Sequence, residues 1–168
     1  MNDHLWRYDK ILTIDQARQK AEELRNAGKK LVTVNGVFDL IQAGHLDFLE
    51  EAKQQGDILF VGINTDKSVR DKKGSSRPII PQDQRAALLA ALACVDYVVI
   101  MDGAYDEEPH GSFLPAIKPD VHANGDDHGQ AETWIEYPAM QELEISAYTV
   151  QRRPNLSTSE IIKKIKSL

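Results

Sequence analysis

Short apolar runs alternate with stretches of helical periodicity along this chain, and this alternation limits the possible folds more than any other feature. The runs expected as strands are residues 31–34, 58–63, 97–101, 121–123 and 146–150. Helices are expected around them at 14–27, 45–55, 81–92, 113–117, 132–142 and from 157 onward. Strands that are apolar throughout are typical of a parallel sheet with helices on both faces. The sequence therefore predicts an α/β domain built on a doubly wound parallel sheet.

The bulk composition fits one globular domain over residues 1–168, with a helical lead-in at 1–28 and the α/β core at 29–168. The net charge of -6 argues against nucleic-acid binding driven by charge. No run approaches the roughly 18 apolar residues of a membrane span, and the start of the chain lacks a signal-peptide pattern. The single cysteine, Cys94, excludes an intramolecular disulfide, and its apolar surroundings predict a buried thiol. We expect a cytoplasmic protein.

Residues 35–45 follow the first predicted strand, and ligands of such sheets bind at the carboxyl ends of strands. Gly36 and Gly44 lack a β-carbon, so backbone can approach a ligand closely at these positions. His45 opens the next helix, where free amides and the helix dipole favour an anion. By itself, a turn with two glycines is a weak signal and favours close packing over a ligand site.

Two further segments suggest phosphate binding. Basic residues gather around Gly74 in residues 70–81, where they fit either a phosphate clamp or a solvated loop. Residues 151–160 combine arginines with a serine- and threonine-rich helix start, which is a capping signature as well as an anion site.

In residues 118–128, the run Asp126-Asp127-His128 is more typical of a solvated loop than of a metal site. We therefore expect no metal held by protein side chains alone.

Together these segments resemble the cytidylyltransferase-like nucleotidyltransferases. That family reads glycine-x-phenylalanine-aspartate and then histidine-x-glycine-histidine, which Gly36, Phe38, Asp39, Gly44 and His45 match. Gln42 stands where the first histidine belongs, and an amide can donate a hydrogen bond but cannot be cationic. The family's basic and C-terminal motifs are matched by Lys73, Arg77, Arg85, Arg152, Ser157 and Thr158. Asn124 replaces a lysine that is usual in heptose-phosphate members.

The resemblance implies a Rossmann-like nucleotidyltransferase fold and a role for each matched residue. The expected catalytic residues are His45, Gln42 and Lys73. The expected nucleotide-binding residues are Gly36, Val37, Phe38, Gly44, Arg77, Arg152, Ser157 and Thr158. The expected substrate-binding residues are Asp39, Asn64, Asp66, Arg85 and Asn124. Arg85 has an alternative interpretation as a helix-surface residue.

The stretch from Val34 to Val99 is most similar to the heptose-1-phosphate adenylyltransferase domain of ADP-heptose synthesis, a step toward lipopolysaccharide. The resemblance thus implies transfer of AMP from ATP to D-glycero-D-manno-heptose 1-phosphate, with Mg²⁺ on the triphosphate and a homodimeric protein. Glycerol-3-phosphate cytidylyltransferase, which uses CTP, and FMN adenylyltransferase are the alternatives within the family. A nucleotide-binding protein with weakened chemistry is the alternative of another class, because Gln42 replaces the first motif histidine.

Overall fold

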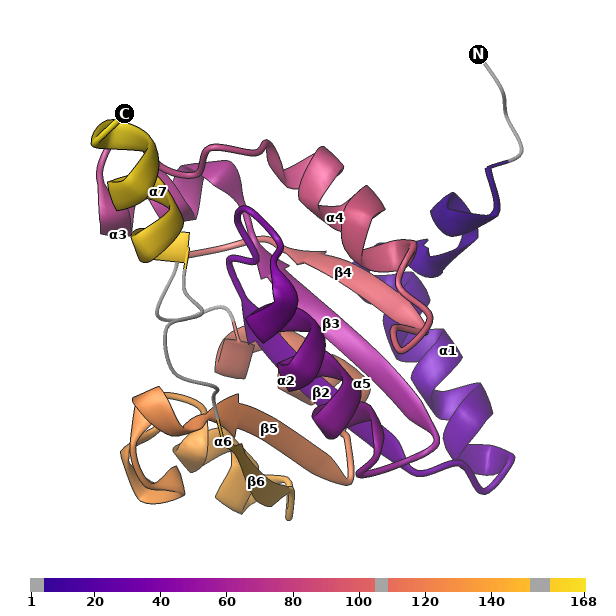
Figure 1. Ribbon diagram of the computed structural model, residues 1–168. Helices are drawn as coiled ribbons and strands as arrows, with labels where there is room; N and C mark the ends of the chain where they lie inside the picture. The colour runs from indigo at the N-terminus through magenta and orange to yellow at the C-terminus, as the bar shows by residue number, and fades with distance from the viewer. Residues whose placement is uncertain (1–4, 105–108, 152–157) are drawn as a thin grey trace.

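The computed structural model describes residues 5–104, 109–151 and 158–168, and its centre is a six-stranded parallel sheet (Figure 1). Its strands, in spatial order, are β1 (Ile11–Leu12), β4 (Tyr97–Met101), β3 (Ile58–Asn64), β2 (Leu31–Gly36), β5 (Val121–Gly125) and β6 (Ser146–Val150). All neighbouring strands run parallel. The predicted α/β class and parallel sheet are confirmed.

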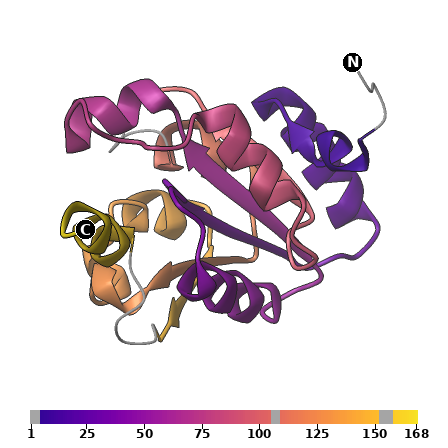
Figure 2. The same cartoon turned by 45° about the horizontal axis from the view of Figure 1, so that its top comes forward.

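Helices cover both faces of the sheet, as the alternation requires (Figure 2). The longer helices are α1 (Ile14–Asn26), α2 (Ala43–Lys53), α3 (Asp66–Lys73), α4 (Gln82–Ala90), α6 (Tyr137–Glu142) and α7 (Thr158–Lys166). The shorter ones are η1 (Trp6–Lys10), η2 (Pro109–Phe113), α5 (Leu114–Ile117), η3 (Asp126–His128) and η4 (Ala131–Thr133). Among the described residues, no helix combines the length and apolarity that crossing a bilayer needs.

The side chains of β3 explain why two separate cores form. Leu59 and Val61 pack with α2 and α4 on one face, whereas Phe60 packs with α1, α5 and α6 on the other. Successive side chains of a strand point to opposite faces, so a strand that is apolar throughout feeds both cores. Cys94 is half-buried against the first core rather than fully buried as expected, and burial raises the pKa of its thiol.

The order of the strands reverses between β2 and β5. From β2 the chain proceeds through β3 and β4 on one side, and it then returns to place β5 and β6 on the other. Backbone pairing between β2 and β5 runs through Val32↔Val121 and Thr33↔His122. A reversal of this kind leaves a crevice at the carboxyl ends of the two strands.

Three elements differ from the sequence-based expectations. Residues 66–73 form α3, a helix that was not predicted; it buries only Ser68 and Val69, so its sequence shows no periodic apolar face. The helix expected at 132–142 divides into η4 and α6, and Pro138 lies in the first turn of α6. The edge strand β1 was not predicted, since two residues are too short to show a periodic pattern.

Candidate functional site

A cavity of about 320 Å³ opens at the carboxyl ends of β2 and β5. Its walls come from the loop after β2, the start of α2, the end of α3, the end of β5 and the start of α7. The sequence-predicted residues that line it are Gly36, Val37, Phe38, Asp39, Gln42, Gly44, His45, Lys73, Arg77, Asn124 and Thr158. Segments far apart in the sequence therefore meet at one site.

Three predicted residues lie elsewhere, and two more are not among the described residues. Asn64, Asp66 and Arg85 are not part of the cavity wall and form a separate network behind it. Arg152 and Ser157 fall outside the described residues. Sequence reasoning missed Asn35, Phe48, Gly125, Asp127, His128 and Ser159, which also line the cavity and mostly adjoin the predicted motifs.

Gln42 and His45 form a reciprocal cap at the N-terminus of α2. The Gln42 side-chain oxygen accepts a hydrogen bond of 2.6 Å from the backbone amide of Gly44. In return, His45 Nδ1 accepts one of 3.2 Å from the backbone amide of Gln42. Such a cap satisfies amides that a helix start otherwise leaves unpaired. Because Nδ1 accepts, the proton of a neutral His45 ring is on Nε2, and that nitrogen is a donor. The NH₂ group of Gln42 likewise stays a donor.

The loop between β2 and α2 has an unusual backbone. Phe38 and Leu40 adopt positive φ angles of 51° and 50°, which residues with side chains rarely do. A β-carbon at Gly36 would lie 3.2 Å from the Phe38 ring, so glycine lets this ring fold back over the strand end. Strained backbone of this kind concentrates at binding and catalytic sites.

Asp39 holds the strained loop in place. Its carboxylate is buried and accepts hydrogen bonds from Arg77 Nε at 2.9 Å, from the Ile79 amide at 2.8 Å and from the Ile80 amide at 2.9 Å. Burial by itself raises the pKa of Asp39, but the two amides and the Arg77 guanidinium outweigh it and hold the pKa below its usual value. Asp39 therefore holds the loop through three hydrogen bonds, and its expected contact with the substrate stays a prediction.

The same loop also anchors α7. Thr158 Oγ1 donates a hydrogen bond of 2.8 Å to the Asp39 carbonyl oxygen. Thr158 is the first residue of α7, and the helix runs beside the segment that follows α3 (Figures 1 and 2). Thr158 is thereby placed at the cavity wall, where the sequence predicted it.

Positive charge gathers at one end of the cavity. The Lys73 side chain is exposed to solvent. The surrounding protein nevertheless removes part of the water from around its ammonium group. This burial lowers the pKa of Lys73 and nearby Arg77 lowers it further, while Asp39 and Asp127 raise it. Two neighbouring cations in the wall of a cavity that also includes the start of α2 favour an anionic ligand such as a polyphosphate.

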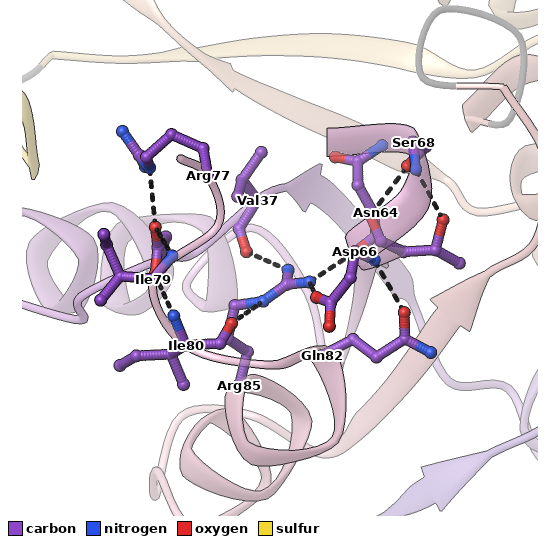
Figure 3. A network of polar contacts seen from close by, with 11 residues as sticks. Val37, Asn64, Asp66, Ser68, Arg77, Ile79, Ile80, Gln82 and Arg85 are labelled. Carbon is purple, nitrogen blue, oxygen red and sulfur yellow. Dashed lines mark hydrogen bonds and ion pairs between the residues drawn. The ribbon is translucent and has the colours of Figure 1, made fainter. Parts of the chain in front are cut away.

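Arg85 connects three loops behind the cavity (Figure 3). Its side chain is fully buried, so the alternative of a helix-surface residue is wrong. The guanidinium donates to the carbonyl oxygens of Val37 at 2.6 Å, Asn64 at 2.9 Å and Ile80 at 2.9 Å, and it pairs with Asp66 Oδ1 at 2.7 Å. These contacts join the ends of β2 and β3 to the loop that positions Arg77. Arg85 thus shapes the site without lining it.

A buried polar layer adjoins Asn35 and Asn124 of the cavity wall. Glu136, just before α6, accepts hydrogen bonds from Asn35 Nδ2 at 3.0 Å and from Asn124 Nδ2 at 3.4 Å. His122 Nδ1 lies 2.9 Å from Thr33 Oγ1. The rings of His122 and Trp134 pack edge to face, with their centroids 6.2 Å apart. No sequence motif points to Glu136, because a lone carboxylate in a predicted helix carries no signal.

The buried His122 predicts a pH-dependent stability. Burial lowers its pKa from 6.5 to about 4, whereas the unfolded chain keeps the higher value. Between these values the unfolded state binds more protons, so this stability is complete above pH 6.5, declines as the pH falls from 6.5 to 4, and is fully lost below pH 4. We expect this residue to contribute a loss of roughly 3 kcal/mol in the free energy of unfolding.

Urea unfolding of the wild type and of His122→Gln from pH 7.5 to 4.5 measures this contribution. The variant should lose less stability over the range, and exposed His128→Gln should follow the wild type. Parallel curves for wild type and His122→Gln would contradict the assignment.

Metal ligands are scarce in this cavity. Among the described residues, no group of three or more histidine, cysteine, aspartate or glutamate side chains could hold a metal ion. Asp39 is occupied by Arg77 and two amides, and Asp127 is the other carboxylate of the cavity wall. A magnesium ion fits here when phosphate oxygens supply most of its ligands. The arrangement as a whole suits a phosphate chain at the cationic end and an uncharged polar group above Asn35 and Asn124.

Comparison with known proteins agrees with this geometry. The family model described as cytidylyltransferase-like matches residues 33–164. The bifunctional protein HldE of Wolinella succinogenes is 40% identical over 157 residues, which is 94% of this chain and 31% of that protein. The same protein of Aliarcobacter butzleri is 39% identical over 155 residues, covering 92% of this chain and 31% of its own length. The chain thus spans about a third of the length of the curated relatives it matches.

Two solved structures share the fold. A lipopolysaccharide core biosynthesis protein from Thermoplasma volcanium superposes with a TM-score of 0.59 at 27% identity, covering 75% of this chain and 98% of that one. A pantoate-beta-alanine ligase from Francisella tularensis, complexed with beta-gamma ATP and beta-alanine, gives a TM-score of 0.61. At 17% identity, with 94% of this chain and 78% of the ligase covered, the second match supports the fold alone.

Proposed function

The chain belongs to the cytidylyltransferase-like family, and we propose that it is an adenylyltransferase that joins AMP from ATP to a sugar phosphate. The acceptor we propose is D-glycero-D-manno-heptose 1-phosphate, with pyrophosphate as the second product. Relatives named HldE and a solved relative named for lipopolysaccharide core biosynthesis support this choice. The observation that carries the proposal is the convergence of His45, Lys73 and Arg77 on one cavity at the start of α2.

In the proposed reaction, a phosphate oxygen of the acceptor attacks the α-phosphorus of ATP. The new P–O bond forms as the bond to the bridging oxygen between the α- and β-phosphorus breaks, and pyrophosphate carries away the electron pair. A phosphate monoester is already ionised near neutral pH, so no protein base has to remove a proton. Catalysis then rests on positioning and on neutralising the charge that develops.

The sequence-predicted phosphate-binding residues of the cavity each have a task in this scheme. His45 Nε2 and the side-chain NH₂ group of Gln42 donate hydrogen bonds to the phosphate chain. The positive charges of Lys73 and Arg77 offset the negative charge of pyrophosphate. We propose that Arg152, Ser157 and Thr158 complete the phosphate site. Mg²⁺ bound to the triphosphate supplies further charge neutralisation. We also propose a homodimer located in the cytoplasm, where ATP is available.

Pyrophosphate release tests the proposal and its alternatives. ATP and CTP are each offered with Mg²⁺ and with heptose 1-phosphate, glycerol 3-phosphate or FMN. The proposal expects release that depends on both ATP and heptose 1-phosphate. Release with CTP and glycerol 3-phosphate, or with ATP and FMN, would assign another member of the family. Folded protein that binds ATP and releases nothing with any acceptor would favour the binding-only alternative.

Replacing Gln42 by histidine is expected to raise kcat about five- to tenfold, because a charged donor makes a stronger hydrogen bond to phosphate than a neutral amide does. A charged ring has both nitrogens protonated and cannot accept from the Gly44 backbone amide, so the variant gains the charge but loses this contact of the α2 cap. Gln42→Ala, which lacks both the donor and the cap, is the matched control and should be slower than the wild type. A histidine variant no faster than the wild type would indicate a site adapted to glutamine.

A further inference from the structure

Asn35 and Asn124 both line the cavity, and we refer to these two residues as its floor; they are neutral amides, whereas Lys73 and Arg77 are cations. Asn35 lies near the end of β2 and Asn124 near the end of β5, so the two amides flank the crevice where the strand order reverses. Backbone pairs join these strands only up to Thr33↔His122. Beyond that pair, side-chain contacts through Glu136 link the two strand ends.

Glu136 sets the orientation of both amides. Its two carboxylate oxygens accept one hydrogen bond each, from Asn35 Nδ2 and from Asn124 Nδ2. An ionised carboxylate is an acceptor only, so each asparagine must turn its NH₂ group toward it. The amide oxygens are then the polar atoms that these residues keep for other partners. Glu136 is itself buried and does not line the cavity.

Asn35 Oδ1 shows that this arrangement leaves hydrogen-bonding capacity unused. It is a buried acceptor with no hydrogen-bond partner among the described residues. An unpaired buried acceptor is costly, and native structures keep one mainly where a ligand, an ion or a water completes it. The neighbouring cavity is the place from which a ligand can supply that donor.

From these contacts we infer that Glu136 is a positioning residue that makes the cavity floor an acceptor of hydrogen bonds, selective for an uncharged donor group of a substrate. The inference rests on the proposed function, in which the phosphates occupy the other end beside Lys73 and Arg77. A carboxylate beneath the floor repels phosphate and favours hydroxyl or amine donors. Two substrate groups have this chemistry: the hydroxyls of the acceptor sugar and the exocyclic amine of adenine.

Glu136→Gln tests the inference because it keeps the shape and removes one acceptor. A glutamine has one oxygen and one NH₂ group, so one asparagine must reverse its amide and present NH₂ to the cavity. Isothermal titration of the full chain then compares ATP, ITP, heptose 1-phosphate and inorganic pyrophosphate. ITP lacks the exocyclic amine of ATP. Glu132→Gln, which removes an exposed carboxylate nearby, is the matched control.

The variant is expected to bind the substrate that meets the floor about tenfold more weakly, which is the loss of one good hydrogen bond. Pyrophosphate should bind as tightly as before or more tightly, because a negative charge has gone. If the floor holds the amine, wild type prefers ATP to ITP and the variant does not. If the floor holds hydroxyls of the acceptor sugar, the variant binds heptose 1-phosphate more weakly and the ratio of ATP to ITP affinity is unchanged.

Equal affinities of Glu136→Gln and Glu132→Gln for ATP and heptose 1-phosphate would overturn the inference. An equal loss of affinity for every ligand, pyrophosphate included, would also overturn the inference, because this result indicates that the substitution disrupts the whole site. If heptose 1-phosphate does not bind the wild type at all, the proposed acceptor is wrong. The titrations of ATP and ITP then decide the inference alone, and an unchanged ratio rejects it.

Discussion

His45→Ala is expected to lower kcat by about 10²–10³-fold or more, because the variant removes a donor directed at the phosphate on which charge develops. The KM for ATP should change much less, since Lys73 and Arg77 keep their charges. Steady-state pyrophosphate release with ATP, Mg²⁺ and heptose 1-phosphate measures both constants. Turnover at the wild-type rate would remove His45 from the mechanism.

His45→Asn separates catalysis from the capping of α2. The asparagine side-chain oxygen can still accept from the backbone amide of Gln42, as His45 Nδ1 does. The asparagine side chain is too short to place a donor where His45 Nε2 lies. The two variants should be similarly inactive. Only the alanine variant should lose the stability of the cap, at most about 1 kcal/mol. An active His45→Asn would mean that the cap, rather than the donor, is what turnover requires.

Arg85→Met is expected to cost about 3–5 kcal/mol of the free energy of unfolding, the range found when a buried ion pair loses one partner. The change leaves three carbonyl oxygens and Asp66 without their donor. Activity should fall as well, because the loop that places Arg77 loses its attachment to β2 and β3. The midpoint of urea denaturation and the rate of pyrophosphate release are the two readouts.

Arg18→Met is the control for Arg85, because Arg18 forms an exposed ion pair on α1. Substitutions at such surface sites usually change stability by less than about 0.5 kcal/mol. Arg85→Lys keeps the charge, but a single ammonium cannot match a planar guanidinium that serves four acceptors, so it should recover only part of the loss. A cost below 1 kcal/mol for Arg85→Met would contradict the role of this network.

The secondary structure was largely predictable because most elements carry a strong local pattern. The limits of β4 and β6 coincide with the predicted ranges, and Gly36, Gly44, Lys73 and Arg77 line one cavity as predicted. The polar helix α3 lacked such a pattern, since tertiary packing of two residues and the Thr65 cap hold it. Edge strand β1 depends on pairing with β4, which no local signal encodes.

The division of labour among the polar residues was not predictable from motifs. Asp39 and Arg85 match family positions, yet the structure engages both with backbone groups from other loops. Glu136 has no motif at all, and only the meeting of β2 and β5 gives it Asn35 and Asn124 as partners. Such contacts join residues far apart in sequence, so a motif can name the residue without naming its partner. The roles of His45, Gln42 and Lys73 stay predictions.

Transfer of isotopic label tests the central claim most directly. The protein is incubated with heptose 1-phosphate, Mg²⁺ and ATP that carries ³²P at either the α- or the γ-position, and the products are separated. Attack at the α-phosphorus predicts that α-label enters the sugar nucleotide and that γ-label leaves in pyrophosphate. Label from the γ-position in the sugar product, or no labelled product from protein that binds ATP, would contradict the account.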